Sequence, residues 1–331
     1  MYTKEFSLLE KQVKAIQEDV SKKHINRVLF VSCGGSLATI QPGTFLLDEL
    51  ADSVFSKAYN SNEFLSAIPR GISEKTLVVL NSQTGNTAET YAAAEKAKEL
   101  GATLIAFSTN PESKLCALAD HPVYYYDNPL DPYPLGLSIY PIVYKTMFAL
   151  IDTLEGTNYS SDVQAALDSV DEIVAKSYEH HLDRAREFAK RMLNEQVIYT
   201  VGGGINTAIA YVVSNCLVME SLWLDSSALA AGEFFHGAVE AFDENSAVFA
   251  LLGLHATRQM EERVVKFLQR KSNKITTLDA NSLFLDSVKP WLKPFFAPII
   301  LNFIAAKYID ELSYLKGHPV SSRRYMGVEK Y

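Results

Sequence analysis

Residues 27–36 read RVLFVSCGGS, and this stretch decides the fold. Arg27–Cys33 is a run of β-branched and apolar residues of the length typical of a buried strand. The two glycines that follow allow the backbone to turn tightly, and a helical pattern then runs from Ser36 to Leu50. The same order of strand, polar turn and helix begins again at Thr76–Leu80. Repeated units of this kind predict a parallel sheet that helices cover on both faces.

The rest of the chain continues this alternation and then restarts it. In the first half, further strand signals lie at Thr103–Phe107 and, more weakly, at Val54–Tyr59 and Val123–Tyr126, with helical patterns at 87–100, 113–119 and 140–154. After the charged helical stretch 162–195, a strand at Val197–Val201 runs into three glycines. We expect helices at 206–222, 257–270 and 291–315 and strands at 247–254 and 274–278.

We interpret this restart as a duplication, although any two strand–turn–helix units look alike at this level of detail. The predicted fold class is α/β, with two tandem domains that are each a mostly parallel, Rossmann-like sheet in a three-layer α/β/α arrangement. The first domain is expected at 1–160 and a linker helix region at 161–195. The second domain, with a C-terminal tail, is expected at 196–331.

The composition is that of a globular protein that needs no disulfide or metal. The 331 residues are 48% hydrophobic and 21% charged, the formal net charge is −8 and the pI is about 5.5. This acidity argues against nucleic acid as a partner, because phosphate backbones are bound by basic surfaces. The three cysteines are too scattered for a zinc site, no apolar stretch is long enough for a membrane span, and Met1–Val20 does not resemble a signal peptide. We therefore expect a cytoplasmic protein without membrane contact.

The first turn, Ser32–Ser36, allows two interpretations. A helix that starts after glycines presents free N–H groups and the positive end of its dipole, which favours a bound anion. A plain turn with Ser36 as the helix N-cap explains the same residues, and taken alone it is the preferred interpretation. The turn lacks the G-x-G-x-x-G pattern, so a dinucleotide site is not predicted.

The second turn, Asn81–Thr87, is richer in polar groups. Hydroxyl and amide side chains surround Gly85, after a buried strand and before a helix. A capped turn needs only one such side chain, whereas a phosphoryl group offers three oxygens to several donors at once. Phosphate binding is therefore favoured here. Glu89 stands three residues after Asn86, which is the spacing of a structural capping box.

These turns resemble those of a known family. CGGS at 33–36 and SQTGNTAET at 82–90 are similar to the phosphosugar-binding loops of the sugar isomerase (SIS) domain superfamily. Glu220 precedes His236 of the segment GEFFHG by sixteen residues, as in the isomerase half of glucosamine-6-phosphate synthase and in the fructosamine-6-phosphate deglycases. The tail, with RRYM at 323–326 and VEKY at 328–331, resembles the deglycase branch most. The resemblance extends over nearly the whole chain.

The resemblance implies two tandem SIS domains and a role for each matching residue. Glu220 would be the base that moves a proton between C1 and C2 of the sugar. His236 would assist ring opening as an acid and base from the neighbouring subunit, which implies a homodimer with shared sites. No cofactor and no metal is implied, because each step before hydrolysis is a proton transfer. The phosphate would be bound by Ser36, Ser82, Gln83, Thr84 and Thr87, with weaker substrate contacts from Gly35, Arg324 and Tyr325.

Some residues have a simpler interpretation or depart from the family pattern. The synthase uses a lysine in its tail where this chain has Arg324 or Met326, and the penultimate Lys330 need not correspond to it. Glu220 lies in an apolar stretch, where an unpartnered carboxylate is costly, so a functional role is favoured over a solvated helix position. His180 and His181 lie on the charged helix and are expected to face solvent.

Three functions fit these residues. The leading hypothesis is a deglycase that hydrolyses a 6-phosphorylated fructosamine, such as fructoselysine 6-phosphate, to glucose 6-phosphate and a free amine. The substrate carries its own nitrogen, so no enzyme lysine is needed to form an imine. One alternative is an aldose–ketose or amino-sugar phosphate isomerase. The other is a non-catalytic sugar-phosphate sensor, which would keep the two turns but have no use for Glu220 together with His236.

Overall fold

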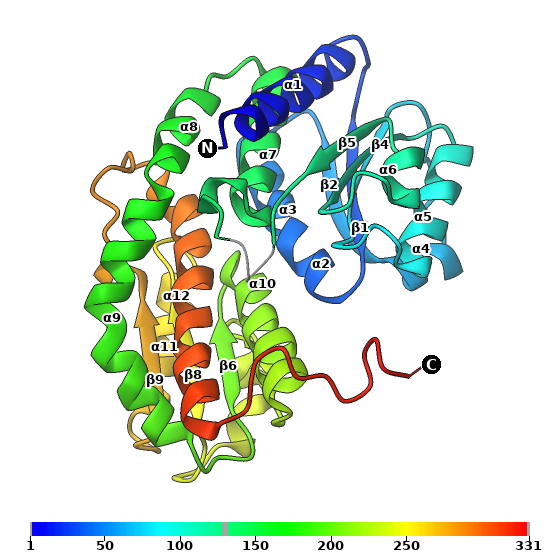
Figure 1. The fold of residues 1–331 in the computed structure, drawn as a ribbon. Coiled ribbons are helices and arrows are strands. Elements are labelled where there is room, and N and C mark those ends of the chain that lie inside the picture. The colour runs from blue at the N-terminus through cyan, green and yellow to red at the C-terminus, as the bar shows by residue number, and fades with distance from the viewer. Residues whose placement is uncertain (1, 128–131, 330–331) are drawn as a thin grey trace. The chain divides into compact units, whose positions relative to one another are not determined.

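The chain folds into two α/β units, each built around its own parallel sheet (Figure 1). The computed structural model describes residues 2–127 and 132–329. The chain divides into the compact units Met1–Asp171 and Glu172–Tyr331. The α/β class and the two parallel sheets confirm the predicted fold.

The sheet of the first unit contains parallel strands in the order β2-β1-β3-β4-β5. All residues of β3 and β4 are buried, which explains why these strands are apolar throughout instead of alternating. The weak strand signals near residues 54 and 123 are confirmed as β2 and β5. The strands are β1 (Arg27–Ser32), β2 (Phe55–Asn60), β3 (Thr76–Asn81), β4 (Thr103–Ser108) and β5 (His121–Tyr124).

Helices cover both faces of this sheet (Figure 1). One face shares a hydrophobic cluster with α4 (Ser61–Ser66), α5 (Ala88–Glu99) and α6 (Lys114–Leu118). On the other face, Gly43 of α3 lies against Phe30 and Met147. The predicted single helix over 36–50 is two helices, because Pro42 stands at the first position of a new one. The helices on this side are α1 (Thr3–Val20), α2 (Gly34–Ile40), α3 (Pro42–Leu50) and α7 (Ile139–Glu155), with α8 (Ser160–Asp168) packed on α7 and a 3₁₀ turn, η1 (Leu135–Leu137), before it.

The sheet of the second unit has the order β7-β6-β8-β9, which repeats the order β2-β1-β3-β4 of the first. This is the order expected of a duplicated unit. The edge strand β7 was not predicted, because three residues are too few to show a pattern. The strands are β6 (Tyr199–Gly202), β7 (Ala228–Ala230), β8 (Val248–Leu252) and β9 (Ile275–Asp279).

The helices of the second unit include one unusual segment. The expected helix over 206–222 begins as α10 (Asn206–Tyr211) and continues as a π-helix, η2 (Val212–Ser221). On one face of the sheet, α11 (Arg258–Leu268), η3 (Phe234–His236) and the neighbouring η4 (Ala238–Ala241) enclose a core cluster. The remaining helices are α9 (Val170–Met192), α12 (Lys293–Lys316) and η5 (Ala280–Ser282), so the predicted linker region 161–195 consists mostly of α8 and α9.

His181 of α9 is buried, which corrects the prediction that it faces solvent; His180 is exposed. The Nδ1 of His181 lies 2.8 Å from the hydroxyl of Tyr308, and its Nε2 lies 2.9 Å from Ser282 Oγ. Burial lowers the pKa of His181 to about 4, so the imidazole is neutral at physiological pH. The charged pattern of α9 concealed this single inward position.

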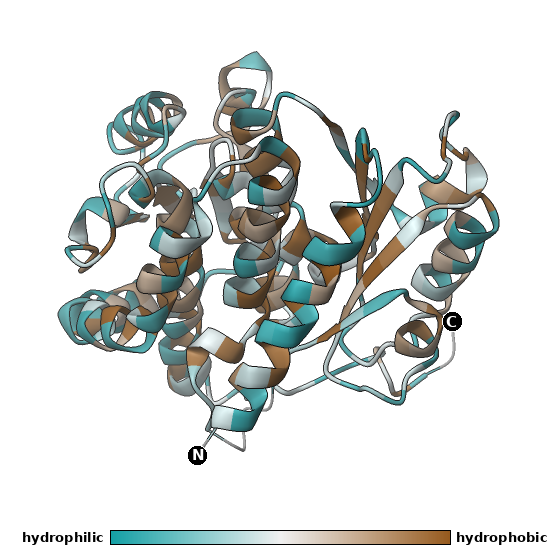
Figure 2. Cartoon of the chain, turned by 90° about the horizontal axis from the view of Figure 1, so that it is seen from above, coloured by the Kyte–Doolittle hydropathy of each residue, from teal (hydrophilic) through white to brown (hydrophobic). Residues whose placement is uncertain are grey.

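Hydropathy follows the layers: apolar residues line the strands and the inner sides of the helices, and polar residues lie outside (Figure 2). Among the helices formed by residues 2–127 and 132–329, none is long and apolar enough to cross a lipid bilayer.

Candidate active site

The second predicted turn leads from β3 into α5. Ser82 is buried, and its Oγ lies 2.9 Å from Oγ1 of Thr87. Thr87 is the N-cap of α5, yet its side chain does not cap the helix, and no other side chain in residues 2–127 and 132–329 does so. The first N–H groups of α5 therefore lack a partner of this kind. Together with the two hydroxyl groups they can bind an anion.

The same geometry corrects the prediction for Glu89. Because the N-cap is Thr87 and not Asn86, Glu89 is the second residue of α5, one position short of a capping box. Asn86 instead bonds within the turn. Its N–H lies 3.4 Å from Thr84 Oγ1, and its Nδ2 donates to the Thr84 carbonyl at 3.1 Å.

Gly85 allows this turn to pack tightly against the start of α6. Its φ is +67°, and a Cβ atom at this position would lie 2.0 Å from Ser113 Oγ. The Gly85 carbonyl also accepts a hydrogen bond from the N–H of Leu115 at 3.2 Å. Ser108 and Thr109, at the end of β4, donate to the carbonyl of Gln83. The turn is therefore anchored by its backbone, so its position does not depend on its polar side chains.

The side chains of Gln83 and Thr84 are exposed on this turn. Gln83 Nε2 donates to Asp127 Oδ2 at 2.7 Å. Asp127 follows the last strand of the sheet, and sequence reasoning missed it because no motif surrounds it. The parallel sheet itself was the available signal, since the carboxyl ends of parallel strands meet at one edge.

Asn81, the last residue of β3, joins this turn to the one after β1. Its Nδ2 donates to Thr39 Oγ1 at 2.8 Å and to the Ser36 carbonyl at 3.3 Å. Its own carbonyl accepts a hydrogen bond from Ser32 Oγ. The two predicted turns are thus brought together, as adjacent parallel strands require.

The preferred interpretation of Ser36 as an N-cap is wrong. The extended residue before the helix is Cys33, so α2 begins at Gly34 and Ser36 is its third residue. Gly34 has a φ of +53° with open space beside it. Within the described ranges 2–127 and 132–329, the Ser36 hydroxyl makes no hydrogen bond, and the residue is partly exposed. This hydroxyl is therefore free for a ligand.

In the second unit, Glu220 is the penultimate residue of the π-helix η2. Rare π-helical turns occur frequently at functional sites. The Glu220 side chain is 25% exposed, and its Oε1 forms an ion pair with Nη2 of Arg323 at 2.8 Å. Burial, assisted by the Glu220 charge, raises the pKa of the neighbouring Cys216 to about 11. The carboxylate of Glu220 is thus partnered, half-buried and close to an inert thiol.

Residues of the chain after α12 and residues around Glu220 together line an open cavity of about 270 Å³, formed by residues 219–220, 223–225 and 323–326. The Arg324 guanidinium lies 4.5 Å from the ring centroid of Trp223. The predicted residues Arg324 and Tyr325 therefore share a cavity with Glu220. Lys330 lies outside the described residues.

His236 ends the short 3₁₀ helix η3 and is exposed. Its N–H donates to the Glu233 carbonyl at 2.9 Å. In the part of the chain that the structure describes, its imidazole makes no hydrogen bond and no ion pair. The imidazole is thus accessible to a substrate or to another chain.

The second sheet has an equivalent pair of turns, but the protein fills it with its own carboxylate. In strand order, β6 and β8 take the places of β1 and β3. Glu261 of α11 is fully buried and accepts hydrogen bonds from the N–H groups of Gly203 (2.8 Å) and Gly253 (2.7 Å) and from Asn206 Nδ2 (3.0 Å). Burial raises the pKa of Glu261, although these donors oppose the rise. The turns of the first unit are therefore the open pair.

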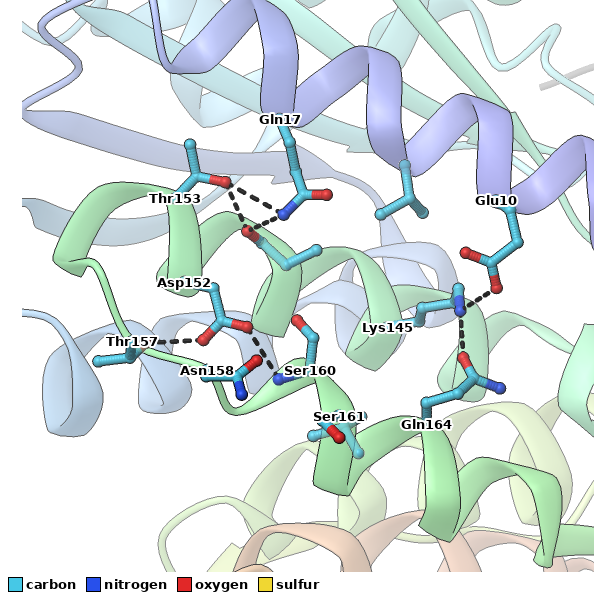
Figure 3. A pocket seen from close by; sticks show the side chains of 13 residues that line it. Glu10, Gln17, Lys145, Asp152, Thr153, Thr157, Asn158, Ser160, Ser161 and Gln164 are labelled. Carbon is cyan, nitrogen blue, oxygen red and sulfur yellow. Dashed lines mark hydrogen bonds and ion pairs between the residues drawn. The ribbon is translucent and has the colours of Figure 1, made fainter.

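A second cavity, of about 530 Å³, lies between α1, α7 and α8 and contains no residue of the turns (Figure 3). Its polar side chains are largely paired with one another. Lys145 Nζ lies 2.5 Å from Glu10 and also bonds Gln164. Asp152 accepts hydrogen bonds from the Thr157 hydroxyl and from the N–H of Ser160, so it ties α7 to α8.

Comparison with known proteins places this chain in a family. A model of the SIS domain matches residues 22–149. Fructosamine deglycase FrlB of Bacillus subtilis (strain 168) is 36% identical over 323 residues, which are 98% of each chain. The chain belongs to the SIS family. Within it, fructoselysine 6-phosphate deglycase of Escherichia coli (strain K12) is 26% identical over 317 residues, 95% of this chain and 89% of that protein.

Solved structures of SIS proteins share the fold over both units. A Bacillus subtilis protein described as a phosphosugar isomerase has a TM-score of 0.94 at 36% identity and covers 97% of each chain. One from Salmonella typhimurium LT2, described in the same way, has a TM-score of 0.93 at 28% identity and covers 98% of this chain and 97% of that chain. These full-length matches extend the likeness beyond the residues that the SIS model covers.

Proposed function

We propose that this SIS protein is a deglycase that hydrolyses 6-phosphorylated fructosamines to glucose 6-phosphate and a free amine. The observation that carries the proposal is the 36% identity to a fructosamine deglycase over 98% of both chains. That span includes the two turns of the first unit and the Glu220 segment of the second. We also propose that the protein is cytoplasmic, since its relatives are metabolic enzymes.

The phosphate would be bound by the turns of the first unit. Ser82 and Thr87 present hydroxyl groups beside the uncapped start of α5, and Ser36 presents a free hydroxyl on the adjoining turn. Gln83 and Thr84 are exposed on the same loop, and Gly35 lies in the first turn of α2. Hydroxyl and backbone N–H donors bind a phosphoryl group without any net positive charge, which suits an acidic protein.

Glu220 would be the base of the reaction. The open-chain fructosamine loses a proton from C1 and gains one at C2, which yields the imine of glucose 6-phosphate. Water then adds to the C=N bond, and the bond breaks to release the amine and the aldehyde. The ion pair with Arg323, at 2.8 Å, would hold the Glu220 carboxylate in place beside the cavity.

His236 would open the sugar ring by moving a proton between the ring oxygen and the anomeric hydroxyl. Its exposed position suits a role in the site of a partner subunit, and we propose a homodimer with shared sites on this basis. We also propose that residues 196–331 form a second SIS domain, because the strand order of its sheet repeats that of the first.

Purified protein incubated with fructoselysine 6-phosphate should release glucose 6-phosphate and lysine, as measured by a coupled dehydrogenase assay. Glu220→Gln and His236→Ala should each lower the rate by roughly 10²- to 10⁴-fold, the usual contribution of a proton-transfer group. Glu187→Gln on the exposed side of α9 serves as the control and should keep the full rate. No product above the blank, or full rates in both site variants, would contradict the proposal.

A phosphosugar isomerase is the second candidate, since two full-length structural matches carry that description. It uses the same phosphate turns and the same base, so the site alone does not separate the two. Product analysis after incubation with fructose 6-phosphate and glucosamine 6-phosphate does. Interconversion of these sugars, without release of amine from a fructosamine, would favour the isomerase.

A further inference from the structure

The cavity beside Glu220 carries two charged groups that the proton transfers do not use. Asp225 and Arg324 both line it. Across residues 2–127 and 132–329, neither side chain forms an ion pair or a hydrogen bond. Arg323 is different, because its guanidinium is already paired with Glu220. The cavity thus offers one unpaired cation and one unpaired anion to a bound molecule.

The guanidinium of Arg324 is positioned by an aromatic ring. It lies over the ring of Trp223, whose other neighbour is the His318 ring at 4.6 Å. Trp223 has a φ of +58°, the one positive value among the described residues other than glycine. A bulky residue rarely adopts this conformation, and such strain gathers at functional sites. Trp223 lies two residues after the π-helix η2, which contains Glu220, so the proposed base and the aromatic ring under Arg324 are positioned by one segment.

We propose that this cavity binds the amine part of the substrate and selects an amine that ends in a free amino-acid group. The carboxylate of that group binds Arg324, and its ammonium lies at Asp225. The inference rests on the proposed deglycase function. It adds which residues of this chain would recognise the amine part of the substrate.

The position of the amine part of the substrate follows from the chemistry of the proposed proton transfer. A base that takes the C1 proton lies about 3 Å from C1, and the amine nitrogen is one bond, about 1.5 Å, from the same carbon. The group carried by that nitrogen must therefore begin beside the carboxylate of Glu220. The cavity that shares Glu220 is where it can extend, and Met219 and Met326 supply apolar walls for an alkyl chain.

The size of the cavity limits the amine. At about 270 Å³ it lies just below the range of roughly 300–1,000 Å³ that is usual for small-molecule pockets. A single amino acid fits such a space. The opposite charges of Arg324 and Asp225 match a zwitterionic head group that is left free when the sugar is joined to a side-chain amine.

Three fructosamine 6-phosphates test this assignment, because they differ in one charge at a time. Their amines are lysine joined through its side chain, cadaverine, which lacks the carboxylate, and 6-aminohexanoate, which lacks the free ammonium. The wild-type kcat/KM should be highest for the lysine compound, by about tenfold over each of the others, as expected for one hydrogen bond to a charged group.

The variants should divide the substrates. Arg324→Gln should lower kcat/KM about tenfold for the lysine and 6-aminohexanoate compounds and leave cadaverine unchanged. Asp225→Asn should lower it for lysine and cadaverine and leave 6-aminohexanoate unchanged. Arg324→Lys should restore part of the loss, since it keeps the charge but not the fork of donors. Arg270→Gln is the matched control, because Arg270 is another exposed arginine near an aromatic ring, 5.7 Å from the Phe267 centroid, and should change nothing.

The outcomes are distinct. Turnover of all three compounds at equal rates, or equal losses on all three in Arg324→Gln, would overturn this inference and leave the deglycase function intact. No turnover of any of them would overturn the function and the inference together. Melting temperatures of the variants should match the wild type, because both side chains are exposed.

Discussion

The two sheets have the same strand order, yet their central turns differ in what they hold. In the first unit the turns after β1 and β3 present hydroxyl groups and an uncapped helix start. In the second unit the turns after β6 and β8 give their N–H groups to the buried Glu261. At the matching fourth position of its helix, α5 has Tyr91. One side chain therefore decides whether such a pair of turns is open to an anion or closed by the protein itself.

The comparison also separates two kinds of constraint. The second turn of the first unit is held through its own backbone, by the bonds that the Gln83 carbonyl accepts from the Ser108 and Thr109 hydroxyl groups and by the close approach at Gly85. The closed turns are held by a side chain that reaches across them. Both copies of a duplicated fold can thus hold their turns in place. Only the copy with open turns can then bind a ligand there.

The largest effect is expected from Gly85→Ala, with Gly34→Ala as its partner. Both glycines have a positive φ, which costs an alanine about 1–2 kcal/mol. At Gly85 the new Cβ would also lie 2.0 Å from Ser113 Oγ, whereas at Gly34 nothing lies within 4 Å. Overpacking adds about 1–3 kcal/mol, so urea unfolding should show a loss of about 3 kcal/mol or more for Gly85→Ala and about 1 kcal/mol for Gly34→Ala. Equal losses of unfolding free energy in the two variants would mean that the turn at Gly85 can move away from Ser113.

Glu261→Ala should open the closed turns. It leaves three buried donors unpaired, and each such donor costs about 1–3 kcal/mol unless water reaches it, so the free energy of unfolding should fall by at least that amount. Inorganic phosphate should raise the melting temperature of this variant more than that of the wild type, because an anion can replace the carboxylate.

The control for this variant is Glu262→Ala, which removes the neighbouring carboxylate and its exposed ion pair with Arg258. It should cost less than about 1 kcal/mol and gain nothing from phosphate. If phosphate stabilises Glu261→Ala no more than the control, the idea that Glu261 occupies an anion site in the turns of the second unit is wrong.

The smallest effect is expected from single hydroxyl groups. Ser82→Ala should weaken the binding of glucose 6-phosphate by about tenfold or less, the value of one hydrogen bond to a charged group. Thr257→Val alters the hydroxyl of the equivalent turn in the second unit and should leave binding unchanged. Isothermal titration calorimetry would measure both, and an equal loss in the two variants would remove the distinction between open and closed turns.

Much of the fold was predictable because buried parallel strands leave a strong local signal. β1, β3 and β4 are runs of apolar residues, and their ends mark the turns that carry the polar groups. The limits of the helices were less predictable. The break at Pro42 and the start of α2 at Gly34 depend on backbone geometry that a helical pattern does not reveal.

Features that depend on distant residues were missed. Glu261 and His181 resemble surface residues in the sequence, because they lie on strongly charged helices. Their burial is decided by partners far along the chain, Gly203 for Glu261 and Tyr308 for His181. Similarly, no local pattern indicates that Arg323 would pair with Glu220 more than a hundred residues before it.

The amino-acid sequence by itself determined the α/β class, the two turns of the first unit and the family to which Glu220 and His236 belong. These depend on hydrophobic runs, glycines and short motifs, which are local properties of a chain. Only the tertiary structure decided that a carboxylate closes the second pair of turns and that Arg323 of the tail pairs with Glu220. Such contacts arise because packing brings together residues from separate elements. The free energy of that packing depends on several segments at once, so no single segment predicts it.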